Sequence, residues 1–430
     1  MTTRWLLRFV LVLAFVASAQ VVAAQDLPAG AAQINTIRKI SGDVYEFVFT
    51  LTTGPGAYDR IGVHRVVRVE DGKPIVSHNA VLLTHGRNWG FEAAFLGDAA
   101  SPHSFGVYLA SHGIDVWGID FSWTLVPQTV SDFTFMQNWG MQHDIDDLER
   151  ALRFARKVRS QTGSDRGRLT LLSWSRGGWI GYGLLNQESQ WPCRHRQVKA
   201  FIPVDTFYKA NAPFAVSGEC SFEATVNKEI KAGIYVDATG QLFEQLGALA
   251  VRDPSGLSPV LPGLTNLQAS LTVGGALFQF LPEFTSFFHF VGGTFGSSGI
   301  SGLAFTSISR WNNLLIAATP FEPVRLLADY AAVTCGDVSL PFDKHLEDIT
   351  VPVFYVGAGG GFGSAGLYTL SLLGSEDVTH DIVSFYPPAE GVLDFGHVDL
   401  FTADDAPNLV WSNILLWLTD HEGDNSCSAQ

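Results

Sequence analysis

The sequence predicts an α/β protein with a mostly parallel central sheet, helices on both faces and one large inserted segment. Strand-like and helix-like runs alternate from residue 79 to 205, which implies parallel strands joined by helical crossovers. The alternation stops over residues 206–345 and then resumes. Four predicted strands end at a polar residue, on the edge where such sheets bind ligands: His85, Asp120, Ser175 and Asp205.

Residues 1–24 have the pattern of a secretory signal peptide. Arg4 and Arg8 precede the apolar run "VLVLAFVASA", and two small-residue cleavage patterns follow, at 17–19 and 22–24. The run is short for a membrane span, which needs ~20 residues. We therefore predict cleavage and a secreted or periplasmic protein, with a single membrane anchor as the alternative.

The composition suits a large folded domain, with 47% hydrophobic and 16% charged residues. The formal net charge is −15, and removal of residues 1–24, which hold two arginines and no acid, shifts it to −17. This charge argues against nucleic acid or anionic lipid as a partner.

The chain has four cysteines, which predict disulfides in an exported protein and whose spacing does not fit a zinc site: Cys193, Cys220, Cys335 and Cys427. We favour the pair Cys220–Cys335, because both residues lie near the ends of the insertion.

The elements before the insertion follow from periodicity and turn signals. Two antiparallel strands, a buried strand, a helix with Gly113 as its left-handed cap, a strand and an amphipathic helix are expected, followed by strand, helix and strand. Their ranges are 43–54, 61–74, 79–86, 104–113, 114–121, 143–158, 168–173, 176–187 and 198–205.

The predicted insertion, residues 206–345, is unusually apolar and divides a core of residues 25–205 and 346–430. From Pro254 to Ser309 it has eight phenylalanines and one charged residue, Glu283. These phenylalanines either form the core of the segment itself or form a lid over an apolar substrate. Beyond it we expect a strand, a glycine-rich loop, a helix, a last strand and a terminal helix, at 351–359, 357–363, 365–374, 380–387 and 405–421.

The stretch "TLLSWSRGGW" (170–179) predicts a strand, a sharp turn and a helix, with Ser175 at the apex. A serine nucleophile at such a turn usually has the pattern G-x-S-x-G, and Ser173 here replaces the first glycine. Residues two before and two after the serine must be small, because the two backbones pass close together. Ser173 and Gly177 meet this requirement, although a serine-rich turn without chemistry remains the alternative for the motif alone.

Four motifs together resemble an α/β-hydrolase with a cap: "LLTHGRNW", "GIDVWGIDF", "LLSWSRGGW" and "DFGHVDLF". The resemblance covers most of the mature sequence, and the last motif is similar to the acid-lipase branch of secreted and lysosomal lipases. It implies that Ser175 is the nucleophile and His397 the general base. It also implies an oxyanion hole built from the backbone N–H groups of Arg87 and Arg176.

The third member of the implied triad departs from the usual placement. The segment after the seventh strand, "YVGAGGGFGSAG", has no carboxylate. The resemblance then favours Asp205, since some relatives have the acid after the sixth strand. Asp377 is the rival, and Asp394 and Asp399 are too close to His397 in sequence to reach behind its ring.

Further residues of these motifs are candidates for substrate contact. The side chains of Arg87 and Arg176 either bind a carboxylate or polar head group, or pair with structural acids such as Asp120 or Glu92. Trp89 and Trp174 are candidate substrate-binding residues.

No metal or cofactor is expected. The sequence "GAGGGFG" fails the dinucleotide pattern at Phe362. His85, His103, His112 and His143 show no ligand spacing.

These observations predict a secreted serine esterase or lipase that acts through an acyl-enzyme. The phenylalanine-rich insertion favours a small-molecule or lipid-like ester with an apolar acyl or aromatic part. An amidase or aminopeptidase on the same fold is the alternative, as is a hydrolase-like binding protein without turnover. The sequence leaves the oligomeric state open.

Overall fold

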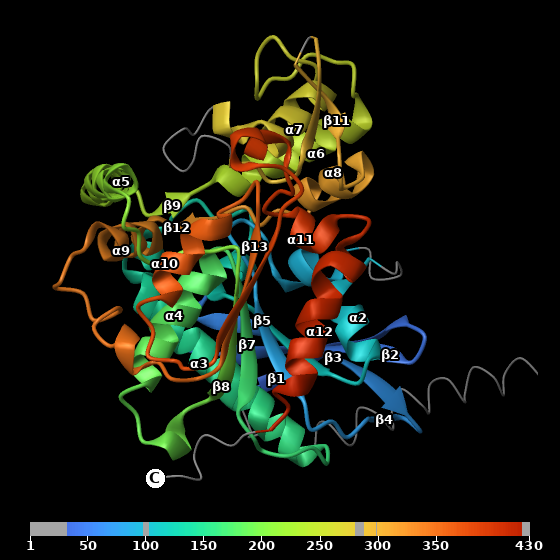
Figure 1. The fold of residues 1–430 in the computed structure, drawn as a ribbon, viewed down its shortest axis with the longest axis vertical. Coiled ribbons are helices and arrows are strands. Elements are labelled where there is room, and N and C mark those ends of the chain that lie inside the picture. Colours follow the sequence, from blue (N-terminus) through green and yellow to red (C-terminus); the bar gives the residue numbers. More distant parts are fainter. Residues whose placement is uncertain (1–31, 98–102, 280–287, 298, 424–430) are drawn as a thin grey trace, which may run out of the picture.

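The computed structural model describes residues 32–97, 103–279, 288–297 and 299–423 (Figure 1). The predicted signal peptide, Glu283 and Cys427 lie outside this part of the chain. Within it, ten strands form one mixed sheet in the order β1-β2-β3-β6-β5-β7-β8-β13-β14, with β4 paired to β3.

The sheet is antiparallel at one end and parallel over the rest. The antiparallel strands are β1 (Ala32–Ser41), β2 (Val44–Thr52), β3 (Arg60–Glu70) and β4 (Lys73–Pro74). The parallel strands are β6 (Asp115–Asp120), β5 (Ala80–Thr84), β7 (Leu169–Trp174), β8 (Val198–Val204), β13 (Val353–Ala358) and β14 (Val378–Val383). Because β5 lies between β6 and β7, the loops after β5 and β7 meet at the carboxyl edge, where α/β sheets bind ligands.

Helices cover both faces of this sheet (Figure 1). On one face lie α2 (Phe105–Ser111) and α12 (Ser412–Asp420), and on the other lie α3 (Met141–Gln161), α4 (Arg176–Glu188) and α10 (Gly366–Leu370). Successive residues of β5 enter different cores: Val81 and Leu83 pack with α2 and α12, whereas Leu82 packs with α3 and α4. The predicted fold class is therefore confirmed.

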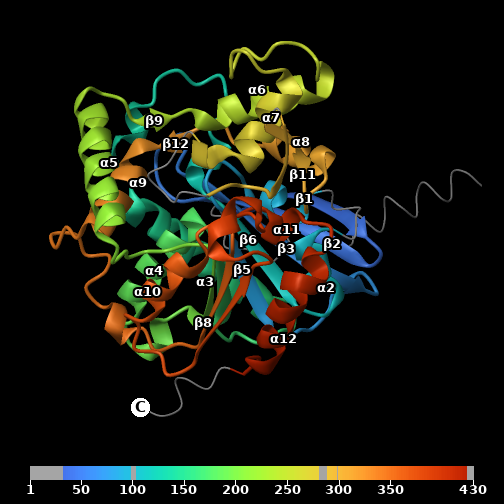
Figure 2. The same ribbon diagram turned by 45° about the horizontal axis from the view of Figure 1, so that its top comes forward.

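The segment between β8 and β13 adds no described strand to the main sheet. It contains α5 (Pro213–Lys231), β9 (Val236–Asp237), α6 (Thr239–Arg252), α7 (Asn266–Gly275), β10 (Gly293–Gly296), β11 (Gly299–Leu303), α8 (Ile308–Ile316), β12 (Glu322–Pro323) and α9 (Val324–Cys335). Helices α6, α7 and α8 lie beyond the carboxyl edge of the sheet (Figures 1 and 2). The predicted disulfide Cys220–Cys335 joins α5 to α9.

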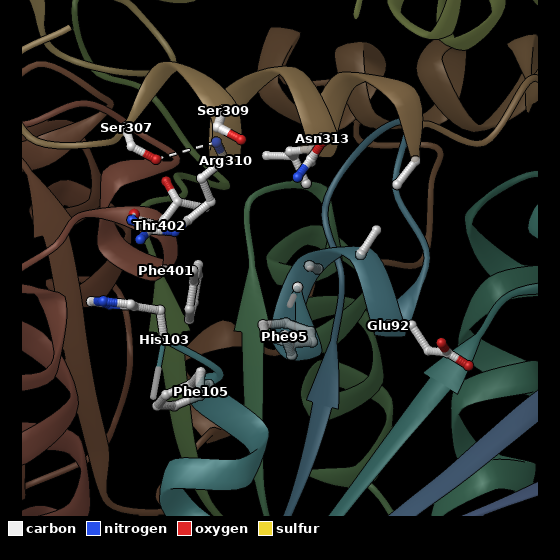
Figure 3. A pocket seen from close by; sticks show the side chains of 15 residues that line it. Glu92, Phe95, His103, Phe105, Ser307, Ser309, Arg310, Asn313, Phe401 and Thr402 are labelled. Atoms are coloured by element: carbon white, nitrogen blue, oxygen red, sulfur yellow. Dashed lines mark hydrogen bonds between the residues drawn. The ribbon is translucent and has the colours of Figure 1, made fainter. Parts of the chain in front are cut away.

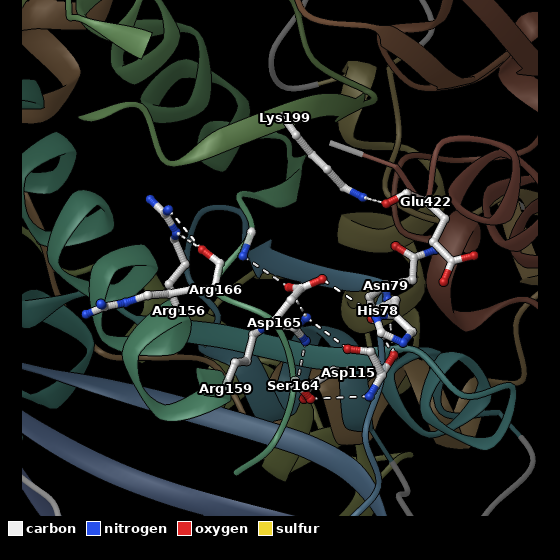
Figure 4. A network of polar contacts seen from close by, with 12 residues as sticks. His78, Asn79, Asp115, Arg156, Arg159, Ser164, Asp165, Arg166, Lys199 and Glu422 are labelled. Atoms are coloured by element: carbon white, nitrogen blue, oxygen red, sulfur yellow. Dashed lines mark hydrogen bonds and ion pairs between the residues drawn. The ribbon is translucent and has the colours of Figure 1, made fainter. Parts of the chain in front are cut away.

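At the amino ends of the parallel strands, buried charged side chains form a network that is separate from the candidate site (Figure 4). Asp115, the first residue of β6, accepts two hydrogen bonds from Arg65, at 2.8 and 2.9 Å, and one from Arg159 at 2.7 Å. Five residues separate Asp115 from the carboxyl end of its strand, so this network is structural.

The elements differ from expectation in several places. The predicted strand 61–74 is divided into β3 and β4, and the predicted last strand, 380–387, is β14 at Val378–Val383. Strand β1 is absent from the sequence prediction, α10 is shorter than the expected helix 365–374, and the terminal helix begins with a π-helical turn, Pro407–Trp411. No helix in the described ranges is long and apolar enough to cross a bilayer.

Candidate active site

Ser175 occupies a strained turn between β7 and α4. Its backbone angles are φ 54° and ψ −123°, a region that non-glycine residues adopt at a cost and that recurs at functional sites. The N–H of Ser175 donates to the carbonyl of Val204 at 2.9 Å. The predicted strand, sharp turn and helix are therefore present.

The two positions flanking the serine are as crowded as the motif requires. A Cβ at Gly177 would lie 2.7 Å from the carbonyl oxygen of His85, so only glycine fits. Ser173 accepts a hydrogen bond from Thr84 Oγ1 at 2.6 Å, and its own Oγ would meet a Cβ at Gly181 at 2.8 Å. Gly181 thus provides the space that Ser173 needs in place of the usual glycine.

The structure brings His397 and Asp205 together. His397 Nδ1 lies 2.6 Å from Asp205 Oδ2, and both side chains are buried. The residue before Ser175, Trp174, stacks on the imidazole with 5.1 Å between ring centroids. The serine turn and the imidazole therefore lie side by side, although 222 positions separate them in sequence.

The glycine-rich loop after β13 holds the carboxylate of Asp205. Asp205 Oδ1 accepts the N–H groups of Ala358 and Gly363, each at 2.9 Å, and Oδ2 accepts the N–H of Phe362 at 3.0 Å. A Cβ at Gly361 would lie 2.0 Å from Oδ2. The loop therefore needs glycine for close approach to the carboxylate, a role for which the sequence contains no signal.

The rival acids lie elsewhere or have other partners. Asp377 is exposed and lies 3.1 Å from Nε2 of His421, at the start of β14. Asp394 accepts N–H groups of Phe385 and Phe395, and Asp399 accepts those of Gly292 and Gly396. Burial raises the pKa of Asp399 to about 6. Through these hydrogen bonds, Asp394 and Asp399 fix the loop that carries His397.

The predicted oxyanion donors are the backbone N–H groups of Arg87 and Arg176. They follow β5 and β7, at the carboxyl ends of these strands. A Cβ at Gly86 would lie 3.0 Å from Cβ of Ser175, so the loop after β5 touches the serine turn. Within the described ranges, the backbone N–H groups of Arg87 and Arg176 have no hydrogen-bond acceptor. The predicted oxyanion role requires N–H groups that are not already used in this way.

The two arginine side chains pair with acids of the protein, which is one of the two predicted alternatives, but the acids are not the ones named as examples. Arg87 pairs with Glu322 (Nε to Oε2, 2.9 Å) and with Asp237, and Arg176 Nη1 lies 2.8 Å from Glu322 Oε1. The contact between Arg176 and Glu322 is close but poorly aligned, because none of the three guanidinium nitrogens of Arg176 makes a hydrogen bond. Asp120 and Glu92, the acids expected here, instead bind His64 and Arg38.

Aromatic rings surround the imidazole of His397. Phe288 and Phe290, from the insertion, lie 5.4 and 6.4 Å from it between centroids, and Phe362 lies 5.4 Å away. These two insertion phenylalanines thus pack on the histidine rather than in a separate core. Trp89 stacks on Trp174, and both are nearly fully buried, so their contact with substrate remains a prediction.

A cleft of about 390 Å³ lies nearby but is separate from these residues (Figure 3). It runs between α8 and the core, where Phe95 and Phe401 line it. Phe401 packs on Trp174, which in turn packs on His397. Two aromatic layers therefore divide the cleft from the imidazole.

Two described groups have the residue types of a metal site, and both are occupied by protein contacts. In the group Glu46, His64 and Glu92, Arg38 pairs with both glutamates. In the group His143, Asp144 and Asp147, Asp144 accepts from Trp123, and Asp147 accepts from Ser122 and Arg150. Neither arrangement points to a metal ion.

Comparison with known proteins supports the architecture. No protein-family model and no curated protein sequence matches the chain. A candidate lipase from Sulfolobus solfataricus matches with a TM-score of 0.60 and 19% identity, over 90% of this chain and 98% of that one. A monoglyceride lipase variant from Saccharomyces cerevisiae matches with a TM-score of 0.45 and 13% identity, over 84% and 91% of the two chains. The chain has the α/β-hydrolase fold.

Proposed function

We propose that the protein is a serine hydrolase of carboxylic esters, with Ser175 as nucleophile, His397 as general base and Asp205 as the acid. The observation that carries the proposal is the 2.6 Å contact between His397 Nδ1 and Asp205 Oδ2 beside a strained serine turn. A serine hydroxyl needs such a base, and the base needs a group that holds its tautomer.

The reaction follows from these positions. His397 Nε2 takes the proton of Ser175 Oγ as that oxygen attacks the ester carbonyl, and the carbonyl oxygen becomes an oxyanion between the N–H groups of Arg87 and Arg176. The imidazolium then protonates the leaving alcohol. Water hydrolyses the acyl-enzyme in a second half-reaction with the same base. Asp205 stabilises the imidazolium and remains ionised.

The aromatic surroundings of His397 support an ester with an apolar acyl or aromatic part. Phe288, Phe290 and Phe362 offer no charged partner to a substrate near the imidazole. We further propose that the protein acts outside the cytoplasm, because its disulfides suit an oxidising compartment. Membership of the acid-lipase branch is part of the same proposal.

The first test is hydrolysis of p-nitrophenyl esters of increasing acyl length by the purified protein and by Ser175→Ala. The variant should lose at least about 10⁴-fold in kcat, because removal of a triad nucleophile leaves only binding and the oxyanion hole. Equal activity of the two proteins would refute the assignment. Hydrolysis of aminoacyl anilides with no ester hydrolysis would favour the amidase alternative.

The same assay decides the acid, with a matched pair of variants. Asp205→Asn should lower kcat by about 10³- to 10⁴-fold, since the imidazole loses its tautomer and its counter-charge. Asp377→Asn makes the same chemical change at an exposed site and should have no such effect. The reverse result would reassign the acid to Asp377.

A further inference from the structure

The insertion places two carboxylates beside the loop that follows β5. Strands β9 and β12 form a two-residue antiparallel ribbon in which Asp237 is paired with Glu322. Directly opposed like charges destabilise such a pair, and Glu322 is only 1% exposed. The pair is therefore stable only with cations against it, and Arg87 contacts both carboxylates.

Glu322 contacts both segments that carry the predicted oxyanion donors. On the loop after β5 it accepts hydrogen bonds from Arg87 Nε and from the backbone N–H of Asn88, each at 2.9 Å. On the serine turn it lies 2.8 Å from Arg176 Nη1. One buried carboxylate from the insertion thus joins two loops of the core.

A second contact holds the same loop from the other side. The carbonyl of Asn88 accepts the N–H of Thr319 at 2.7 Å. Asn88 has φ 64°, a left-handed conformation that asparagine tolerates better than most residues. Residues 319–322 of the insertion therefore fix the peptide that follows the N–H of Arg87.

We propose that Glu322 is a positioning residue for the oxyanion hole, through which the docked insertion holds the N–H groups of Arg87 and Arg176 in place. The inference rests on the proposed function. Oxyanion donors act at 2.7–3.1 Å from the developing charge, and a shift of about 1 Å can cost about 10²-fold in rate. The oxyanion hole is then complete only when the insertion is docked on the core.

Because Glu322 is charged, a purely electrostatic role and a positioning role predict opposite changes of kcat in Glu322→Gln. A negative charge close to the oxyanion opposes its formation, so an electrostatic role alone predicts that Glu322→Gln raises kcat. A positioning role predicts that it lowers kcat, because the amide has one oxygen instead of two to accept from Arg87 and Asn88 and no charge to pair with the two guanidinium groups. Its neutralisation also leaves Arg176 without a paired charge in the interior.

The experiment compares Glu322→Gln and Glu322→Ala with a control that breaks a different contact between insertion and core. Asp404→Asn is the control, because exposed Asp404 pairs with Arg310 of α8 at 2.9 Å. We expect Glu322→Gln to lower kcat about 10²-fold with KM changed less than about threefold. Glu322→Ala should lose more, and Asp404→Asn should keep the kcat of the parent. Asp237→Asn should have a smaller effect than Glu322→Gln.

Amide hydrogen exchange provides a readout that does not depend on turnover. Exchange at residues 86–90 should be at least about tenfold faster in Glu322→Gln and unaltered in Asp404→Asn. If the parent hydrolyses no ester, the proposed function fails, and this measurement still decides whether Glu322 holds the loop after β5 in place. Unchanged exchange, an unchanged or higher kcat in Glu322→Gln, or an equal loss in Asp404→Asn would each overturn the proposal.

Discussion

At the residue scale, the carboxylate of Asp205 depends on a loop without any charged side chain. Three backbone N–H groups and the imidazole of His397 use its two oxygens. Charge-assisted hydrogen bonds of this kind are among the strong ones in proteins. The geometry of the candidate triad is therefore set as much by glycines as by its acid.

Gly361→Ala tests this dependence. The added Cβ would lie 2.0 Å from Asp205 Oδ2, so either the loop or the carboxylate must move. We expect kcat to fall about 10²-fold, as for other misplacements of about 1 Å, with KM nearly unchanged. Gly296→Ala is the control, because a Cβ there meets no atom closer than 3.8 Å. Steady-state kinetics that leave kcat of Gly361→Ala equal to that of the control would contradict the role of the loop.

The sequence indicated the site residues that lie next to the strands and missed those that arrive from elsewhere. Ser175 and Asp205 follow parallel strands, so the α/β rhythm predicts their common edge. Glu322 gave no such signal, because it lies in a two-residue strand of the insertion. Nor could the sequence exclude Asp120, whose carboxylate is used by His64 and the N–H of Phe91.

At the scale of elements, one buried histidine joins three strands of the sheet. His64 of β3 lies 2.8 Å from Glu46 of β2 and 3.0 Å from Asp120 at the end of β6. Burial alone would lower the pKa of His64, but the charges and hydrogen bonds of Asp120 and Glu46 outweigh it and raise the pKa to about 9. The imidazolium is thus the stable form at neutral pH.

This pKa shift predicts a loss of stability in alkali. The ordinary pKa of histidine is 6.5, so the stabilisation is complete below that pH and is lost as the pH rises through about 9. Urea unfolding from pH 6 to 10 should show the free energy of unfolding falling by about 3 kcal/mol more in the parent than in His64→Gln. A difference between the two proteins that stays constant with pH would contradict the charged pair.

The sequence predicts best the strands that are buried on both faces. Strands β5, β7, β8 and β13 are buried along their whole length and appear in the sequence as short, mainly apolar runs. Among the described strands, β1 pairs with β2 alone, and none of its residues 34–41 is buried. Its polar residues therefore gave no apolar pattern from which to predict a strand. Beyond Leu370 the predicted helix continues only as tighter turns, in which the N–H groups of Leu372 and Leu373 donate to carbonyls three residues earlier.

At the scale of the whole molecule, the insertion is bound to the core at its carboxyl edge and closed on itself by a disulfide. Cys220 and Cys335 are 115 residues apart, and Glu322 lies between them. The disulfide therefore restricts the part of the chain that carries the proposed positioning residue. Stability and activity should be linked through it.

Replacing both cysteines by serine, Cys220→Ser with Cys335→Ser, tests that link. For a loop of this length, lost chain entropy gives a destabilisation of up to about 4–5 kcal/mol, visible as a lower Tm in calorimetry. Because the freed insertion holds the oxyanion loop less firmly, kcat should fall as well. Cys193, which lies outside the insertion, is also disulfide-bonded, so Cys193→Ser should lower Tm with kcat retained. If both proteins lost kcat equally, the disulfide would have no particular connection to the oxyanion hole.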